Sequence, residues 1–221
     1  MTAMQIAIDG PAGAGKSTAA KAVAKELGYL YIDTGAMYRA VALMAMRRHI
    51  DEGQIQQLID LTRDLDISLR QMEDGYYVFA DGEDITKDIR RPEVGNLASA
   101  ISAIAEIRKL LVKKQQDLAA HTPVVMDGRD IGTVVLPKAE CKIFLTADSA
   151  IRAQRRVLEL KERGIDTDPQ QVEADIIKRD LQDSNRAASP LKKADDAVLL
   201  DNSYLSVEEV VAEILRIAKE R

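Results

Sequence analysis

The N-terminal part of the chain contains two short apolar runs, each followed by a stretch with helical spacing. Residues 5–9 and 29–33 are apolar runs of the length of a buried strand. Residues 16–27, which are rich in Ala and Lys and end at Gly28, and residues 34–46 have the pattern of helices. This order of strand, helix, strand and helix predicts a parallel sheet with crossover helices.

Three further apolar runs continue this pattern later in the chain. They cover residues 123–127, 142–146 and 197–200, and polar residues follow at their carboxyl ends. Open α/β sheets bind ligands at the carboxyl ends of their strands. We therefore expect a five-stranded parallel sheet with a functional site at that edge.

One segment departs from the α/β pattern. Residues 67–85 alternate apolar and polar positions, and they contain the turn-forming pairs Asp74-Gly75 and Asp81-Gly82. This pattern predicts a small antiparallel insert that is separate from the main sheet.

The remaining segments have helical patterns. Residues 93–121 have helix-like sequence, and residues 149–163 and 169–186 predict two helices joined by residues 164–168. Asp168 suits an N-cap, with Gln171 placed to complete a capping box. Residues 206–219 predict the final helix, with Ser206 as its N-cap and Glu209 three positions later.

Composition narrows the class of protein. The chain has 221 residues, a net charge of −5 and 46% hydrophobic residues, which is typical of a globular domain. Its acidic balance argues against binding to nucleic acid or to anionic membranes. The single cysteine, Cys141, and the only two histidines, His49 and His121, argue against a disulfide framework or a Cys/His metal cluster. With no membrane-length apolar run and no charged leader at the N-terminus, we expect a cytoplasmic protein.

A glycine-rich loop carries the strongest chemical signal. Residues 10–17 match the phosphate-loop pattern G-x-x-x-x-G-K-[ST], between a predicted strand and a predicted helix. Glycines let backbone N–H groups approach phosphate oxygens, and the helix directs its positive end at them. Lys16 would reach the β- and γ-phosphates of ATP, and the Ser17 hydroxyl would bind Mg²⁺. The alternative is a glycine-rich turn without a ligand. The expected ATP-binding residues are Gly10, Pro11, Ala12, Gly13, Ala14, Gly15, Lys16, Ser17 and Thr18.

The residues after the third strand bear on what kind of phosphate-loop protein this is. The N-K-x-D and D-x-x-G patterns of guanine-nucleotide switches are absent. Asp127 lies at a strand's carboxyl end, where a carboxylate can stand behind a Mg²⁺ ion without ligating it directly. Arg129 and Asp130 would face the same cleft, although an ordinary polar turn with a local ion pair explains them as well.

Two consecutive predicted helices each present charged residues on one face. Arg152, Arg155 and Arg156 are spaced three and four apart on the first helix. On the second, Arg179, Asp183 and Arg186 also share a face. Each helix alone suits a solvated surface with ion pairs. Together, in a phosphate-loop protein, they favour a lid that places guanidinium groups over phosphates.

The scarcity of histidine favours a phosphate acceptor. Transfer to a hydroxyl usually needs a group that accepts its proton, whereas a phosphate monoester, with a second pKa of about 6, is already an anionic nucleophile. An enzyme that joins phosphate to phosphate needs positioning and charge neutralisation, which Lys16, Mg²⁺ and arginines supply.

Four segments together carry a family likeness. Residues 10–17, 33–39 (DTGAMYR), 127–134 (DGRDIGTV) and the motif from Arg179 to Arg186 closely resemble the bacterial cytidylate kinases. The likeness extends in register from about residue 5 to the last helix. It implies a P-loop NTPase fold with strand order 2-3-1-4-5, ATP and Mg²⁺ as cofactors, and transfer of the γ-phosphoryl group to CMP or dCMP.

The resemblance also implies roles for individual residues. Thr34 and Arg39 would hold the nucleoside monophosphate, and Ser99, Arg108 and Asp130 would recognise the cytosine ring. Arg129 and Arg186 would contact the phosphates, with Arg179 and Asp183 at the sugar. The expected catalytic residues are Lys16, Arg129, Arg152, Arg155, Arg156 and Arg186. Family members often have Ser at the position of Thr34, so the hydroxyl is retained.

We therefore expect a single kinase domain over residues 1–221, with a monophosphate-binding lobe at about 34–100 and a lid at about 150–186. Its partners would be ATP, CMP and dCMP, without nucleic acid or membrane, and the protein would be a monomer. Two alternatives remain open. One is a related kinase acting on another monophosphate, on shikimate or on a coenzyme precursor, and the other is a slow ATPase that signals by conformation.

Overall fold

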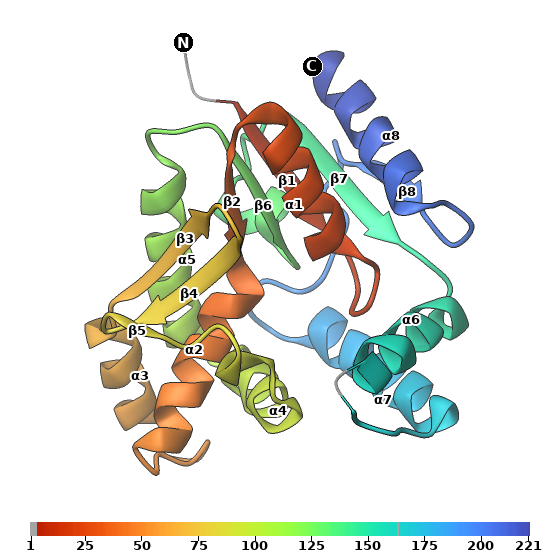
Figure 1. Cartoon of the computed structure of the whole chain (residues 1–221). Coiled ribbons are helices and arrows are strands. Elements are labelled where there is room, and N and C mark those ends of the chain that lie inside the picture. The colour runs from red at the N-terminus through yellow and green to blue at the C-terminus, as the bar shows by residue number, and fades with distance from the viewer. Residues whose placement is uncertain (1–3, 163) are drawn as a thin grey trace.

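The computed structural model describes residues 4–162 and 164–221, which are built on a five-stranded sheet. In spatial order its strands are β2 (Leu30–Asp33), β6 (Val124–Gly128), β1 (Gln5–Asp9), β7 (Cys141–Thr146) and β8 (Val198–Asp201). Neighbouring strands run parallel throughout. The predicted α/β class and the strand order 2-3-1-4-5 are confirmed (Figure 1).

The two faces of the sheet bury alternate residues of its strands. Ile6 and Ile8 pack with helices α1 (Lys16–Leu27) and α8 (Val207–Lys219) in the larger core. Ala7 belongs instead to a second core on the opposite face. That face is covered by α5 (Ala105–Ala119) and by η2 (Ile131–Val135), a π-helical turn that the sequence pattern did not predict. Because successive side chains of a strand point to opposite faces, one short apolar run builds both cores.

Between α2 and β6 the chain forms the predicted antiparallel insert. Strands β3 (Ile67–Met72), β4 (Gly75–Ala80) and β5 (Glu83–Asp84) make a separate three-stranded sheet, in which Ile67 lies opposite Ala80. Helices of the same region are α2 (Thr34–Arg47), α3 (Ile55–Asp64), the 3₁₀ turn η1 (Asp88–Arg90) and α4 (Pro92–Ile101).

The helical segments add detail that the sequence pattern did not give. Helix α3 was not predicted, and the helix-like sequence over residues 93–121 forms two helices, α4 and α5, separated at Ser102–Ile104. The Ser102 carbonyl at this break accepts a hydrogen bond from Arg108 Nη1 at 3.1 Å. The chain therefore changes direction where a tertiary contact replaces the helical one.

Helices α6 (Ser149–Glu162) and α7 (Pro169–Asn185) form an antiparallel hairpin with its own small core. That core consists of Ala153, Leu160, Val172 and Ile176. Figure 1 shows the hairpin and helices α2 and α4 at the end of the sheet away from both chain termini. Arg163, predicted to end the first helix, and residues 1–3 of the predicted domain lie outside the described residues.

Of the two predicted N-terminal helix caps, the one at α8 is confirmed in full and the one at α7 in part. Ser206 and Glu209 form the expected capping box at α8, with Oγ of Ser206 accepting from the Glu209 N–H at 3.2 Å. At α7, Asp168 does cap the helix, but it accepts from the Gln170 N–H at 3.0 Å. The box with Gln171 is wrong, because the Gln171 amide donates to Asp175 one turn further on.

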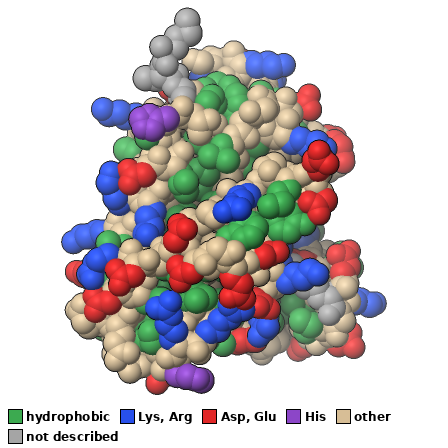
Figure 2. All heavy atoms as spheres, turned by 60° about the vertical axis from the view of Figure 1, so that its left-hand side comes forward, with side chains coloured by type: hydrophobic (Ala, Val, Ile, Leu, Met, Phe, Trp, Pro, Cys, Tyr) green, Lys and Arg blue, Asp and Glu red, His purple; other side chains and the backbone are tan. Residues whose placement is uncertain are grey.

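The surface carries side chains of both charges, and the single cysteine is buried. Figure 2 shows positive and negative side chains interspersed on the side that is on the left in Figure 1. Within the described residues, no helix is long and apolar enough to cross a membrane. Cys141 is fully buried as the first residue of β7.

Candidate active site

The glycine-rich loop connects β1 to α1 and approaches its neighbour β7 very closely. Gly10 has φ +150°, and a Cβ there would lie 1.9 Å from the Leu145 carbonyl oxygen, so only glycine fits. Gly13 and Gly15 also have positive φ, of 74° and 81°. The loop therefore takes a path that exposes its N–H groups at the start of α1, where the helix dipole is positive.

Lys16 is buried inside this loop. Its side chain donates from Nζ to the Pro11 carbonyl at 2.7 Å, and the residue is 6% exposed. Burial, and then the charge of Arg129, lower the pKa of Lys16 to about 7, while Asp127 and Asp9 oppose this change. The loop thus holds a buried, partly desolvated amine.

Ser17 and Asp127 lie together beside the loop. The Ser17 hydroxyl donates to Asp127 Oδ2 at 2.9 Å, and the Tyr31 hydroxyl donates to Oδ1 at 2.8 Å. Burial, together with the charge of Asp33, raises the pKa of Asp127 to about 6. A hydroxyl and a carboxylate offer the oxygen donors that Mg²⁺ prefers. Among the described residues, no three acidic, His or Cys side chains form a metal cage.

Residues at the start of α2 adjoin Asp127. The Thr34 hydroxyl donates to the Asp127 carbonyl at 2.8 Å. Asp33 caps α2 by accepting from the Ala36 N–H at 2.8 Å, and it also pairs with Arg39 at 3.1 Å. The segment from Asp33 to Arg39 is therefore anchored to the end of β6.

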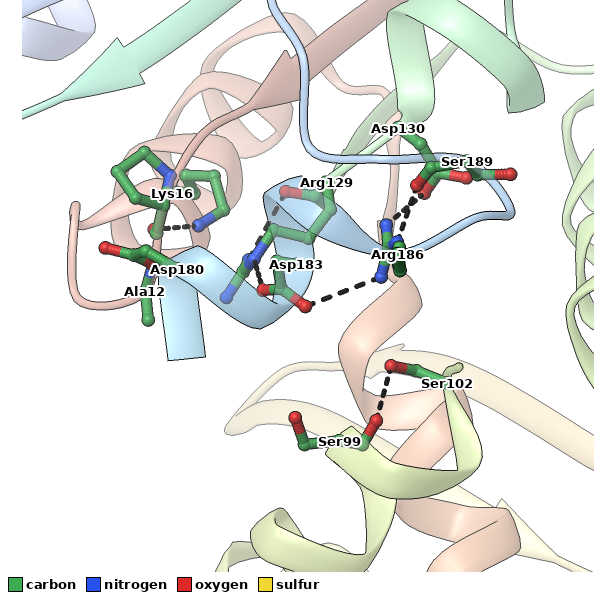
Figure 3. Close-up of polar contacts among 12 residues, drawn as sticks. Ala12, Lys16, Ser99, Ser102, Arg129, Asp130, Asp180, Asp183, Arg186 and Ser189 are labelled. Carbon is green, nitrogen blue, oxygen red and sulfur yellow. Dashed lines mark hydrogen bonds and ion pairs between the residues drawn. The ribbon is translucent and has the colours of Figure 1, made fainter. Parts of the chain in front are cut away.

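A second group of charged residues surrounds Asp130. Asp130 pairs with the buried Arg108, whose guanidinium also lies 5.4 Å from the centre of the Tyr38 ring. Arg186 lies 3.9 Å from Asp130 and 3.5 Å from Asp183. Ser99, in contrast, lies on α4, where its carbonyl accepts from the Ser102 hydroxyl (Figure 3). The described hydrogen bonds do not join it to Arg108 or Asp130.

Asp183 stands between two arginines. It accepts from Arg129 Nε at 2.9 Å and pairs with Arg186 (Figure 3). Burial alone would raise the pKa of Asp183, but Arg129, Arg186 and Arg179 hold it below its usual range. The carboxylate therefore stays charged and fixes the two guanidinium groups beside it.

Several nitrogen atoms in this region lack hydrogen-bond partners although they are buried. They are Arg108 Nε, Arg179 Nε and Arg186 Nη2. Burial, and next the charge of Arg129, lower the pKa of Arg179 to about 10, with Arg39 and Arg156 acting in the same direction. Buried donors without acceptors and mutually repelling cations together indicate a site for an anion.

The three arginines expected on one face of the first lid helix have different surroundings. Arg152 is 7% exposed and donates to the Ala147 and Ala12 carbonyls and to Asp180. Arg155 donates to the Asn202 side chain and carbonyl at 3.0 and 2.8 Å. Arg156 is half-buried and pairs with Glu159 on its own helix. Arg156 is therefore the one whose ion pair is local to its helix.

Sequence reasoning missed three residues that hold the site's backbone. Asp180 accepts from the Ala12 N–H at 2.9 Å, and Asn202 Nδ2 donates to the Ala14 carbonyl at 2.8 Å. Asp9 accepts from the Ile131 and Gly132 N–H groups, each at 2.7 Å. The sequence signal that could have pointed to these residues is their position in the chain. Asp9 ends β1, Asn202 follows β8, and Asp180 adjoins Arg179.

Comparison with known proteins identifies the family. A sequence profile for "Cytidylate kinase" matches residues 6–220. The cytidylate kinase of Caldicellulosiruptor bescii is 50% identical over 217 residues, covering 98% of this chain and 96% of that enzyme. The Lactiplantibacillus plantarum cytidylate kinase is 51% identical over 215 residues, covering 97% and 94%. The chain belongs to the cytidylate kinase family.

A solved structure with much lower sequence identity to this chain has a similar fold. An uncharacterized protein from Eubacterium ventriosum has a TM-score of 0.53 and 14% identity, with 99% of each chain covered. This similarity concerns the fold alone. Within the cytidylate kinase family, the resemblance expected from the four sequence segments is confirmed over nearly the whole chain.

Proposed function

We infer that this member of the cytidylate kinase family transfers the γ-phosphoryl group of ATP to CMP or dCMP, giving ADP and CDP or dCDP. The identity of about half of all residues over the full length with cytidylate kinases carries this conclusion. The geometry supports it, because a phosphate loop and a cluster of buried arginines occur at the same edge of one sheet.

The ATP phosphates would lie in the loop from Gly10 to Thr18. Its N–H groups and the Lys16 ammonium would neutralise their charge. Ser17 would hold Mg²⁺ directly, and Asp127, bound to the Ser17 hydroxyl, would orient that ligand from behind. The ion would supply charge neutralisation at the β- and γ-phosphates.

CMP would occupy the arginine-rich region opposite the loop. Arg39, Arg129 and Arg186 would bind its phosphate, with Thr34 nearby, and Arg179 and Asp183 would contact the sugar. Ser99, Arg108 and Asp130 would contact the cytosine ring, Ser99 approaching from α4 when substrate is bound. The unpartnered nitrogen atoms of Arg186 and Arg179 support this placement, because the CMP phosphate would supply an acceptor to the first and a sugar oxygen to the second.

Transfer in this site would need no general base. A CMP phosphate oxygen forms the new bond to the γ-phosphorus while the bond to the β–γ bridging oxygen breaks, and ADP leaves with that electron pair. The lid arginines Arg152, Arg155 and Arg156 would act on the ATP side. Closure of the lid would exclude water, which is the competing acceptor.

A coupled assay of ADP release tests this function. ATP-Mg²⁺ is supplied with CMP, dCMP, UMP, AMP, GMP or no acceptor. We expect fast release with CMP and dCMP, slow release with UMP and negligible release without an acceptor. Release that ignores the acceptor would assign the chain to the slow ATPases instead. Activity with AMP or GMP alone would overturn Ser99, Arg108 and Asp130 as cytosine-binding residues.

We propose that the active species is a monomer. Light scattering at the assay concentration should give a mass near the chain's 24.3 kDa. A stable dimer would contradict this proposal without affecting the substrate assignment.

A further inference from the structure

The lid hairpin touches the phosphate loop through one carboxylate and one arginine. Asp180 on α7 accepts from the Ala12 N–H at 2.9 Å through Oδ1, and its Oδ2 pairs with Arg152 on α6. Arg152 Nη1 also donates to the Ala12 carbonyl at 2.8 Å. Both backbone polar groups of Ala12 are therefore held by side chains of the hairpin. Figure 3 shows Asp180 next to Ala12 and Lys16.

These contacts set the direction of two successive peptide groups. In a trans peptide the C=O and the following N–H point to opposite sides. When Arg152 holds the Ala12 carbonyl outward, the Gly13 N–H is directed the other way. Likewise, Asp180 holds the Ala12 N–H while Lys16 donates to the carbonyl of the same peptide group, that of Pro11, at 2.7 Å.

The packing around this contact is close. Arg152 is 7% exposed, and a Cβ on Gly13 would lie 3.2 Å from the Cβ of Arg152. Arg152 is further fixed by donating from Nε to the Ala147 carbonyl at 2.8 Å. The carboxylate and the guanidinium therefore have little freedom to move without moving the loop.

We propose that Asp180 is a positioning residue for phosphoryl transfer: with Arg152 it holds the peptide groups on either side of Ala12 in the orientation that receives the ATP phosphates. The proposal rests on the proposed function, in that ATP is the ligand of the loop. It gives Arg152 a supporting role at the loop in place of direct contact with the transferring group.

The test compares Asp180→Ala and Asp180→Asn with the wild type. Asp175→Asn is the matched control, because Asp175 is an exposed acid on the same helix whose carboxylate accepts from Gln171 at 2.9 Å, one turn away. Calorimetry measures the Kd of a non-hydrolysable ATP analogue without CMP, and the Kd of CMP without ATP. Steady-state assays give kcat and both KM values, and circular dichroism reports folding.

We expect Asp180→Ala to weaken binding of the ATP analogue by about tenfold, as loss of a charge-assisted hydrogen bond does, with a fall in kcat and with CMP binding within twofold of wild type. Asp180→Asn should lie between, since its amide oxygen can still accept from Ala12. Asp175→Asn should match the wild type.

Two results would overturn the proposal. One is an unchanged affinity for the ATP analogue in a folded Asp180→Ala protein, or in Asp180→Asn if the alanine variant does not fold. The other is an equal loss of affinity for CMP and for the ATP analogue, which would make Asp180 a general structural residue. If the wild type shows no CMP-dependent ADP release but the ATP-analogue result holds, the proposed acceptor is wrong and the positioning role stands.

Discussion

Lys16 combines a positive charge with an interior position. Its pKa is lowered to about 7 from an ordinary value of 10.5, first by burial and then by Arg129. Part of the population is therefore neutral near physiological pH. Phosphate oxygens beside the ammonium would favour the charged form and return the pKa toward its ordinary value.

This difference predicts proton uptake on ATP binding. Between about pH 7 and pH 10 the complex holds a proton that the free protein lacks, so affinity should fall as pH rises, by up to about tenfold per pH unit. Calorimetry at pH 8 in two buffers of different ionisation enthalpy measures the uptake. Lys16→Met should abolish the part due to this side chain. Equal enthalpies in both buffers for the wild type would contradict the prediction.

Removing the Lys16 charge should stop catalysis while the fold is retained. Lys16→Met keeps an apolar chain of similar length, and burying it costs less than burying an ammonium. Loss of one preorganised charge at the phosphates should lower kcat by at least about 100-fold. Lys25→Met, an exposed lysine on the same helix, is the control. Near-normal turnover of Lys16→Met would remove the loop from the active site.

Asp183 should affect the binding of CMP, the second substrate. Asp183→Ala frees Arg129 and Arg186, which it now holds, and removes the carboxylate proposed to accept from the sugar hydroxyl. We expect KM for CMP to rise by about tenfold or more, while binding of an ATP analogue persists. An unchanged KM and kcat with both CMP and dCMP would exclude Asp183 from the site.

At the scale of elements, the parallel strands were predictable because each is a short apolar run with clear ends. Helix α3 was missed although its buried residues Leu58, Leu61 and Thr62 and the partly buried Ile59 have helical spacing, so the signal for it was present in the sequence. Neither Gly nor Pro marks the break between α4 and α5. The contact made there comes from Arg108, whose guanidinium reaches back from α5 to the Ser102 carbonyl.

The candidate site was predictable where local motifs carry it. The phosphate loop and Asp127 follow from strand and helix patterns, whereas Ser99 and Arg108 depended on family resemblance. Asp9, Asp180 and Asn202 could not be found in this way, because each binds backbone from a segment more than a hundred residues away. Their partners are peptide groups, which have no sequence signature.

Gly128, the last residue of β6, lies where β6, α2 and η2 pack closely together. A Cβ at Gly128 would lie 2.6 Å from both Thr34 Oγ1 and Ile131 Cδ1. Gly128→Ala should therefore push α2 and η2 away from β6, raising KM for CMP and lowering stability by about 1–3 kcal/mol. Gly95→Ala is the control, because a Cβ there meets nothing within 4 Å in helix α4. Thermal unfolding and steady-state kinetics measure both effects, and identical behaviour of the two variants would contradict this account.

At the scale of the whole molecule, the α6–α7 hairpin is held less strongly than the sheet. Its core of four residues is separate from the two cores that pack on the sheet. Regions with few buried apolar contacts open at lower free energy than the centre of a protein. The part of the hairpin beyond Arg152 and Asp180, which bind the phosphate loop, is therefore best suited to move as a lid.

Hydrogen exchange should reveal this difference. Amides of α6 and α7 should exchange well before those of β1 and β6 in the free protein, and an ATP analogue with CMP should slow the hairpin selectively. Mass spectrometry of exchanged peptides measures both. Equal protection of hairpin and sheet, with or without ligands, would argue against a mobile lid.

The buried thiol makes such motion accessible to spectroscopy. Cys141 is the chain's one cysteine, and burial raises the pKa of its thiol to about 11, so at neutral pH it offers almost no thiolate to an alkylating dye. An Asp166→Cys variant, at the exposed turn between α6 and α7, would carry the sole reactive thiol. A spin label or fluorophore attached there could follow the hairpin in real time, without any need to replace a native residue in the core.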